Sequence, residues 1–234
     1  MMPSVVVHSN PRLLNQVESS QWLKAGFERH GIGAQITSDK WKGADIHVVQ
    51  GPWYAYNEWL GQKNVLFLNC CFYGDRRFDL SVGWLRPDGT RDFKNHGMTV
   101  HNGILPELKP EKENRRCAVV FGDFGTDPTE QIIDAKGHYQ TVYYRPHPAQ
   151  TEKQPGVISL RSDLAGVWGL ADVAIGGSST VLVDAEINGL HVECSDPLHV
   201  VHHDGTREQW LTDLSWANWN YKQLIAGDFW EHLC

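Results

Sequence analysis

The chain has 234 residues, of which 41% are hydrophobic and 21% are charged, and its formal net charge is -7 at pH 7. These values fit one large domain or two small ones with a packed core, and no apolar run reaches the roughly 18 residues of a transmembrane helix. The acidic balance argues against broad nonspecific nucleic-acid binding, which depends on Lys and Arg to neutralise phosphates.

Cysteine usage and the N-terminus indicate the compartment. The five cysteines show no CxxC spacing and their number is odd, which favours reduced thiols in a cytoplasm over a disulfide framework or a zinc site. The first residues, MMPSVVVHSN, lack a basic n-region and a long apolar segment, so no secretion signal is expected. The ten tryptophans fit core packing, and also the stacking of sugars or bases on exposed rings.

Strand and helix signals alternate along the first half of the chain. Short apolar runs predict strands over 4–10, 33–37, 45–51 and 64–72, and apolar positions at helical spacing predict a helix over 11–31. Residues 53–61 are predicted to form a short helix or turn. Residues 80–95 alternate around a Pro-Asp-Gly turn and predict a β-hairpin. This alternation is typical of a parallel sheet covered on both faces.

The alternation of strands and helices restarts after the polar segment LPELKPEKENRR (105–116), which contains two prolines and predicts a linker over 107–116. Strands are then predicted over 117–125, 140–148, 172–177 and 191–197, and helices over 127–137, 161–171 and 178–190. Asp127 is expected to cap the first of these helices, with Pro128 at its first position. Residues 207–233 predict one or two amphipathic helices.

The motif RPHP follows the strand expected over 140–148. Pro146 and Pro148 restrict the backbone on either side of His147, so the imidazole is presented at a fixed angle. Arg145 adds a permanently charged guanidinium, which can donate two parallel hydrogen bonds to a phosphate. The alternative is a rigid surface turn with incidental polar residues. In open parallel sheets, ligands bind where strands end, so we predict a phosphate-facing site here.

A second polar stretch, GGSST, lies between a predicted strand and a predicted helix. Main-chain N–H groups and hydroxyls at such a point bind anions, although Ser and Thr are also ordinary helix caps. The stretch is neither a GxGxxG fingerprint nor a Walker motif. Asp184 and Glu186 follow in the same helix and would bind ribose hydroxyls, or else belong to a solvated helix face.

These three stretches, taken together, resemble the C-terminal domain of GT-B glycosyltransferases. RPHP followed by ADVAIGGSSTVLVDAEINGLHVECSDP is similar to the capsule-polysaccharide and Kdo-transferase type over about residues 117–197. The resemblance implies a nucleotide-sugar donor, with His147 and Gly177, Ser178, Ser179 and Thr180 around its phosphates and Asp184 near the ribose or sugar. The chain departs from the family in having Asp184 instead of Glu and GLHV instead of GKPV.

The GT-B resemblance also implies the domain plan. We expect an α/β fold with two Rossmann-like parallel-sheet domains, an N-terminal acceptor domain over 1–106 and a nucleotide-sugar domain over 117–214. Residues 215–234 are expected to form a C-terminal helix that crosses back onto the first domain. The C-terminal tail and small size also resemble small phage-encoded members, which would place the protein in the host cytoplasm.

The acceptor is expected to be a hydroxymethylated pyrimidine in phage DNA or a glycan. His8, Asn10 and Arg12 follow the first predicted strand, where GT-B acceptor loops commonly start, and Arg76 and Arg77 would contact phosphates. Asp75 is the preferred base for the acceptor hydroxyl, with His8 and Asp123 as the other candidates.

The predicted activity is metal-independent transfer of a sugar from a nucleotide sugar, with a UDP-sugar as co-substrate and no further cofactor. His202 and His203 are adjacent and would point to opposite faces of a strand, so they are interpreted as a surface turn and not as a metal site. Two alternatives stay open, a non-hydrolysing nucleotide-sugar epimerase and a non-catalytic module that binds a nucleotide sugar.

Overall fold

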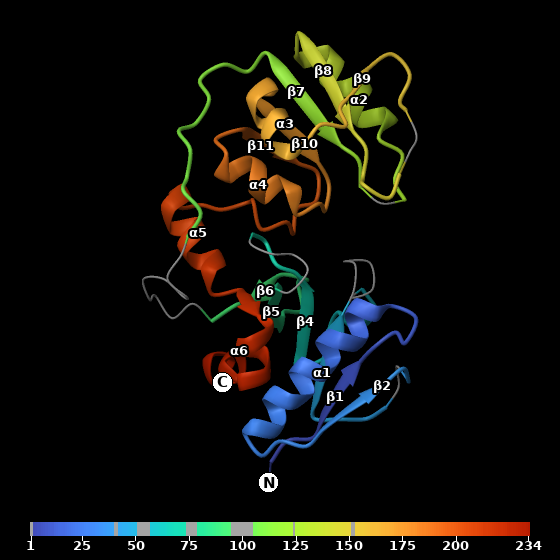
Figure 1. The fold of residues 1–234 in the computed structure, drawn as a ribbon, viewed down its shortest axis with the longest axis vertical. Coiled ribbons are helices and arrows are strands. Elements are labelled where there is room, and N and C mark those ends of the chain that lie inside the picture. The colour runs from blue at the N-terminus through green and yellow to red at the C-terminus, as the bar shows by residue number, and fades with distance from the viewer. Residues whose placement is uncertain are drawn as a thin grey trace. The chain divides into compact units, whose positions relative to one another are not determined.

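The structure is a computed structural model that describes residues 2–39, 42–50, 57–73, 79–94, 105–123, 125–150 and 153–234. The chain divides into two compact units. Unit 1 comprises Met1–Leu105 and Gln209–Cys234, and unit 2 comprises Pro106–Glu208. Each unit is built on its own sheet with helices packed against it (Figure 1).

The sheet of unit 1 has the strand order β12-β5-β4-β3-β1-β2, and β6 pairs with β5. Strands β1 to β4 are parallel, whereas β5, β6 and β12 pair in antiparallel fashion, so the predicted hairpin is present. The elements of the N-terminal segment are β1 (Val5–His8), α1 (Leu14–Arg29), β2 (Ala34–Thr37), β3 (Ile46–Gln50), the 3-10 helix η2 (Asn57–Trp59), β4 (Val65–Cys70), β5 (Asp79–Leu85) and β6 (Arg91–Asp92).

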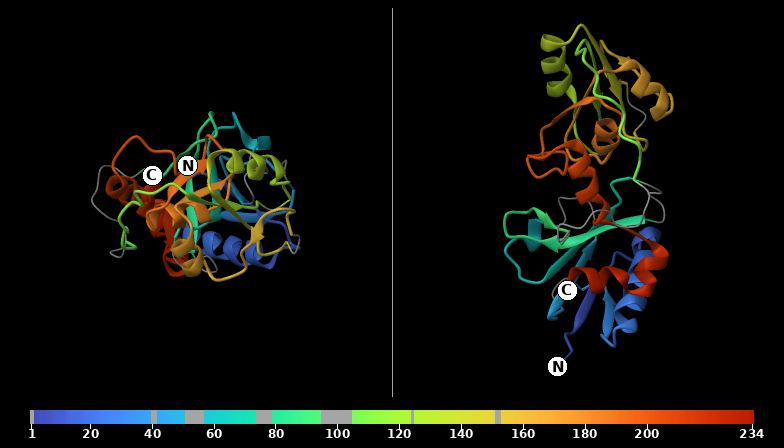
Figure 2. Two further views of the ribbon diagram at one scale, coloured as in Figure 1. Left: turned by 90° about the horizontal axis from the view of Figure 1, so that it is seen from above. Right: turned by 90° about the vertical axis from the view of Figure 1, so that its left-hand side faces the viewer.

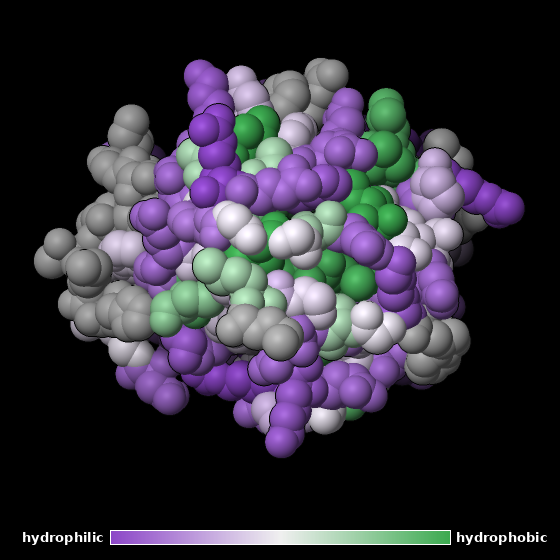
Figure 3. Space-filling model, turned by 90° about the horizontal axis from the view of Figure 1, so that it is seen from below, coloured by the Kyte–Doolittle hydropathy of each residue, from purple (hydrophilic) through white to green (hydrophobic). Residues whose placement is uncertain are grey.

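One face of this sheet carries the larger core. Side chains from β1, β3 and β4 pack there against Leu23 and Phe27 of α1 and against Leu224 and Phe229 of the C-terminal segment. Figure 2 shows α1 and the C-terminal helices on the same side of the sheet. A smaller cluster around Phe67 packs on the opposite face. In Figure 3, which views the end where the N-terminus lies, hydrophobic side chains gather near the centre and hydrophilic ones surround them.

The C-terminal segment differs from the one or two helices predicted over 207–233. It forms α5 (Arg207–Ser215), the short strand β12 (Asn218–Asn220), α6 (Tyr221–Ala226) and α7 (Asp228–Leu233). Asn220 caps α6 in a capping box with Gln223, which explains why the helix restarts there. The expected return onto the N-terminal domain is confirmed, because α6 packs on α1. A Cβ on Gly26 would lie 2.1 Å from the Leu224 carbonyl oxygen, so α1 needs a glycine at this contact.

Unit 2 has a fully parallel sheet in the described part of the chain, with the order β11-β10-β7-β8-β9. Helix α2 packs on one face around Ile132 and Ala135, and α3 and α4 pack on the other around Val167 and Leu182. Its elements are β7 (Cys117–Phe121), α2 (Thr129–His138), β8 (Thr141–Arg145), β9 (Ile158–Ser159), α3 (Leu164–Leu170), β10 (Val173–Gly176), α4 (Val181–Ile187) and β11 (His191–Cys194).

Helix α2 begins one residue later than predicted. Pro128 occupies the cap position, and the Asp127 carboxylate still accepts the backbone N–H of Thr129 at 3.1 Å. Strand β9 was not predicted, because its two residues carry too little periodicity to be seen.

The segment predicted as a linker, 107–116, is hydrogen-bonded to unit 2. The backbone N–H groups of Lys109 and Lys112 donate to the carbonyls of Ile187 and Gly189. The Lys112 ammonium donates to the carbonyls of Trp168 and Ala171 at 2.6 Å each. This ammonium therefore satisfies carbonyls at the C-terminal end of α3.

None of the helices within the described ranges has both the length and the apolar character that crossing a bilayer requires.

Candidate functional site

The order of strands in unit 2 reverses at β7. Strands β7, β8 and β9 follow one another in one direction across the sheet, and β10 and β11 lie on the other side of β7. Ligands of open α/β sheets bind beyond the carboxyl ends of the strands at such a reversal. The segments that follow β7 and β10 here contain Asp123 and the predicted loop 177–180.

Asp123 binds the main chain of this loop. Its carboxylate oxygen Oδ2 accepts the N–H of Ser178 at 3.0 Å, and the N–H of Gly177 also hydrogen-bonds the carboxylate. A Cβ on Gly177 would lie 2.3 Å from Oδ2, so only a glycine allows this approach. The N–H groups of the loop thus bond to a carboxylate of the same chain, whereas the predicted ligand was a donor phosphate.

The pKa of Asp123 is raised, because burial disfavours the charged carboxylate. The backbone N–H groups of Ser178 and Gly177 and the nearby His147 act in the opposite direction and stabilise the charge. Asp196 raises the pKa further by repulsion. A partly buried carboxylate with a perturbed pKa at a strand reversal has the features of a catalytic or ligand-binding group.

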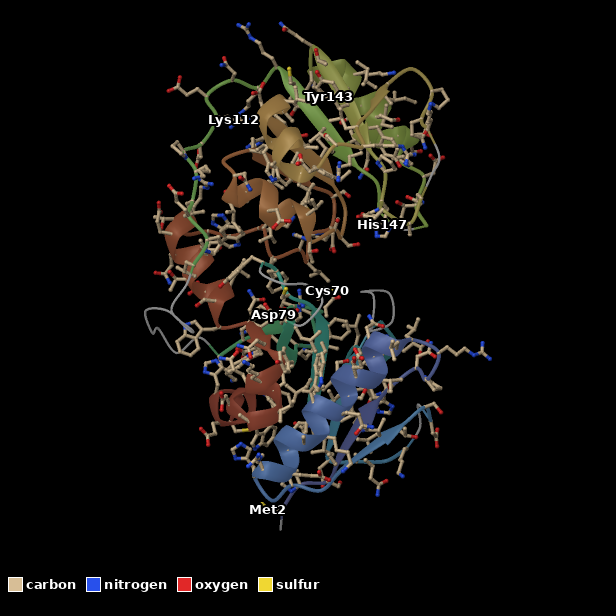
Figure 4. All side chains as sticks on the ribbon, viewed as in Figure 1. Met2, Cys70, Asp79, Lys112, Tyr143 and His147 are labelled. Atoms are coloured by element: carbon tan, nitrogen blue, oxygen red, sulfur yellow. The ribbon has the colours of Figure 1, made fainter. Side chains whose placement is uncertain are left out.

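His147 lies on the segment that follows β8, where Figure 4 labels it. Its Nδ1 accepts the N–H of Ala149 at 3.2 Å, and its carbonyl accepts the N–H of Gln150 at 2.8 Å. The backbone N–H of Ala149 therefore helps to orient the ring. Because Nδ1 accepts a hydrogen bond, the neutral ring carries its proton on Nε2.

Arg145 is the last residue of β8, and its guanidinium donates from Nη1 to the carbonyl of Ser162, in the segment before α3. Its own carbonyl accepts the N–H of Gly122 at 2.9 Å. Arg145 thus ties the end of β8 to two neighbouring segments. His147 interacts electrostatically with Asp123, whereas the Arg145 guanidinium is held at Ser162.

The remaining loop residues lead into α4. Thr180 is its N-cap in helical conformation, with no side-chain cap hydrogen bond, and the carbonyls of Ser179 and Thr180 accept the first N–H groups of the helix turn. Asp184 is half-buried in the first turn of α4. Glu186, the other carboxylate considered for a ribose, instead pairs with Arg207, with 2.8 Å between Oε1 and Nε.

Cys194 supports the loop from β11. Its thiol donates to the carbonyl of Gly177 at 3.0 Å, and burial raises the pKa of Cys194 to about 11. The thiol therefore stays protonated and acts as a hydrogen-bond donor. Sequence reasoning missed this role, since a lone Cys in a short strand carries no signal for it.

The acceptor residues predicted in unit 1 fall into two groups. Asp75, Arg76 and Arg77 lie outside the described residues. Asn10 and Arg12 form the turn after β1, where the Asn10 side chain accepts the N–H of Arg12 at 3.0 Å and both residues are exposed.

His8 lies at the end of β1 and is paired with His47 of β3, with 3.1 Å between Nε2 of His8 and Nδ1 of His47. Burial first, and repulsion from His47 second, lower the pKa of His8 to about 4, although Asp39 acts in the opposite direction. Trp59 of η2 packs against both imidazoles. His47 and Trp59 were not predicted; the available signal was a histidine inside the apolar strand IHVVQ.

The histidines at 202 and 203 bond to backbone carbonyls, those of Asp196 and Gly205. Across the residues that the structure describes, three or more His, Cys, Asp or Glu side chains do not converge on a point that would hold a metal ion.

No protein-family model and no curated protein matches the chain. Among solved structures it is similar to KpsC, the beta Kdo 2,7 transferase of Thermosulfurimonas dismutans, with a TM-score of 0.56 and 14% identity over 95% of this chain and 97% of that chain. A D-2-hydroxyisocaproate dehydrogenase matches 74% of this chain and 61% of its own length at 10% identity, with a TM-score of only 0.22.

The likeness to KpsC extends over nearly the whole length of both chains. It confirms the predicted fold class, two Rossmann-like domains of GT-B type with a C-terminal helix on the first. The chain therefore shares the two-domain fold of that structure.

Proposed function

We propose that the protein is a glycosyltransferase that moves a sugar from a nucleotide donor, bound by unit 2, to a hydroxyl of a glycan, bound by unit 1. The observation that carries the proposal is the group formed by Asp123, His147 and the 177–180 loop at the strand reversal of unit 2. The glycosyltransferase-like fold of the whole chain supports it.

The phosphate contacts are assigned with one change from the prediction. The N–H groups of Gly177 and Ser178 already bond to Asp123, so these two residues hold the carboxylate. We assign the phosphates to the hydroxyls of Ser179 and Thr180 and to Nε2 of His147, which is a proton donor in the neutral ring. Such donors stabilise the charge that develops on the leaving diphosphate.

Arg145 is assigned a supporting role, because its guanidinium binds the Ser162 carbonyl and so steadies the end of the strand that carries His147. Asp184 is assigned to ribose or sugar hydroxyls. Asp75 remains the proposed base, with Asp123 as the alternative carboxylate.

A glycan acceptor is preferred over DNA because of charge. Unit 2 contains nine Lys and Arg against sixteen Asp and Glu, so it carries the whole net charge of -7, while unit 1 is neutral overall. Duplex DNA binding needs several uncompensated cations, and its affinity falls steeply with salt. A hydroxylated sugar has no such requirement.

The test measures nucleotide release and thermal shift of the protein with a panel of nucleotide-sugar donors. UDP-, GDP- and CMP-sugars are each supplied with a glycan panel or with hydroxymethylated duplex DNA, and nucleotide-activated Kdo is included because the structural neighbour is a Kdo transferase. His147→Ala should lower turnover by about 100-fold or more, as expected when a donor to the leaving oxyanion is lost.

The matched control is His138→Ala, which removes an exposed histidine at the end of α2 in the same unit and should leave turnover unchanged. Absence of binding and turnover with every nucleotide sugar would refute the proposal. Donor binding without turnover would favour a non-catalytic module, and interconversion of the free donor would favour an epimerase. DNA-stimulated turnover would overturn the assignment of a glycan.

A further inference from the structure

Two histidines interrupt an apolar face of the sheet in unit 1. Strands β1 and β3 pair in parallel with Val6 opposite His47, so His8 and His47 share one face by the alternation of side chains. The hydrophobic cluster on this face consists of Val49, Val65, Phe67 and Leu85, with the ring of Trp59 packed against it. Placing imidazoles among such residues costs free energy unless the imidazoles form hydrogen bonds. Polar residues at otherwise apolar positions of a sheet are found most often at functional sites.

The pair also lies where the strand order of unit 1 reverses. Strands β1 and β2 are neighbours on one side, and β3 continues the sheet on the other side of β1. His8 belongs to β1 and His47 to β3, so the two imidazoles meet across this reversal. Open α/β sheets bind ligands beyond the carboxyl ends of the strands at such a reversal. His8 is the last residue of β1, whereas His47 is the second residue of β3 and lies opposite Val6, two residues before that end.

The hydrogen bonding of the pair leaves one ring nitrogen for a ligand. Nε2 of His8 faces Nδ1 of His47 at 3.1 Å, Nδ1 of His8 is buried, and the backbone of Asp39 also interacts with the His8 ring. Within the described part of the chain, Nε2 of His47 is the remaining nitrogen, neither bonded to another residue nor among the buried unpartnered atoms.

The ligand that this arrangement fits is uncharged and rich in hydroxyls. The two facing nitrogens share one proton, and a second proton would place two positive rings with centroids 5.4 Å apart. A neutral imidazole nitrogen pairs well with a hydroxyl, because a hydroxyl both donates and accepts a hydrogen bond. Trp59, whose ring centroid is 5.0 Å from that of His47, adds an aromatic surface of the kind that packs against a sugar.

We propose that His47, oriented by His8 and covered by Trp59, binds a hydroxyl of the sugar acceptor on unit 1. This assignment rests on the proposed function and adds two residues, His47 and Trp59, to the acceptor side. His47 acts by positioning the acceptor, whereas Asp75 is the proposed base. Loss of His47 should therefore raise the acceptor KM more than it lowers kcat.

The experiment titrates a neutral monosaccharide and a neutral disaccharide into the full chain without any donor, and follows the imidazole nitrogens by NMR. The signal of Nε2 of His47 should move with sugar concentration, while that of the exposed His138 in unit 2 should not. His47→Gln should weaken sugar binding, and raise the acceptor KM in transfer, by about 3- to 10-fold, the value of one hydrogen bond. His8→Gln should weaken binding less, because it frees the His47 ring to rotate.

The wild-type titration needs no variant, so a folding defect in His47→Gln leaves the test intact. The assignment would be overturned if the His47 signal did not move with either sugar. It would also be overturned if a folded His47→Gln protein bound sugar as tightly as the wild type. Movement of this signal with hydroxymethylated duplex DNA instead of sugar would also overturn it. If sugar moves the His47 signal but no nucleotide sugar is turned over, the sugar site on unit 1 is supported and the proposed transferase activity is refuted.

Discussion

A methyl group at position 177 is the sharpest probe of the unit 2 site. In Gly177→Ala the new Cβ would lie 2.3 Å from Oδ2 of Asp123, and protein Cβ atoms essentially never approach another heavy atom within 3.0 Å. The carboxylate must therefore move and give up its bonds to the N–H groups of Gly177 and Ser178. A hydrogen bond to a charged group contributes about 1.5–3 kcal/mol, so we expect a loss of at least this size.

The measurement is the free energy of unfolding from urea titrations, with thermal unfolding as a second readout. A loss of about 1.5–3 kcal/mol corresponds to a fall in Tm of about 3–12 °C in a chain of this size. Gly169→Ala is the matched control, because it lies in α3 of the same unit and its Cβ would meet nothing within 4 Å. This control should be neutral or stabilising by up to about 1 kcal/mol.

A double-mutant cycle tests the stated cause. In an Asp123→Ala background the new methyl group has no carboxylate to displace, so Gly177→Ala should cost almost nothing there. An equal cost in both backgrounds would show that the methyl group disturbs something other than Asp123. A Gly177→Ala protein as stable as Gly169→Ala would refute the reasoning altogether.

Three further variants test the remaining features. Asp75→Asn should lower kcat by about 100-fold or more while donor affinity is retained, as judged by initial rates and calorimetry; an unchanged kcat would exclude Asp75 as the base. The pKa of His8 is lowered to about 4, so the unfolded chain binds more protons below pH 6.5 and the folded protein loses stability as pH falls from 6.5 towards 4. Urea titrations at a series of pH values should show that His8→Gln loses less stability than the wild type between pH 6.5 and 4. An equal loss of stability in both proteins would contradict this prediction. Arg207→Gln should destabilise by about 3–5 kcal/mol because it leaves Glu186 unpaired, with side chains only 13% and 14% exposed. Adding Glu186→Gln should recover part of this loss, and no recovery would argue against the ion pair.

The larger elements were predictable because their patterns are local. Short apolar runs such as Val5–Val7 in β1 and Val119–Phe121 in β7 identify buried strands, and the helix over 11–31 follows from its apolar spacing. Strand β12 was not predictable in the same way. Its three residues lie between helices, and Trp219 is held in an extended conformation by pairing with Leu80, which is 139 residues earlier. Pairing over such a distance leaves no periodic trace in the sequence.

The residues of the candidate site stay a prediction, and the structure adds contacts that the sequence did not indicate. The sequence predicted that the loop after β10 binds phosphate, and in the structure the N–H of Ser178 bonds to Asp123, 55 residues earlier. The glycine at 177 is required by that carboxylate, not by a phosphate. Reading this from the sequence would need the strand order, because only the adjacency of β7 and β10 brings the two segments together.

Strand order explains why both units place polar groups where they do. In unit 1 the reversal lies between β1 and β3 and contains the pair of His8 and His47; in unit 2 it lies between β10 and β7 and contains Asp123 against the 177–178 backbone. At a reversal the connections leave in opposite directions, so the ends of the two central strands are not covered by a crossover between them. Asp123, the 177–178 backbone and His8 lie at or just after such strand ends and can meet a ligand there, whereas His47 lies two residues before the end, opposite Val6 on the sheet face. The two pairs should therefore be tested as the two halves of one reaction, with sugar binding followed at His47 and donor binding at His147.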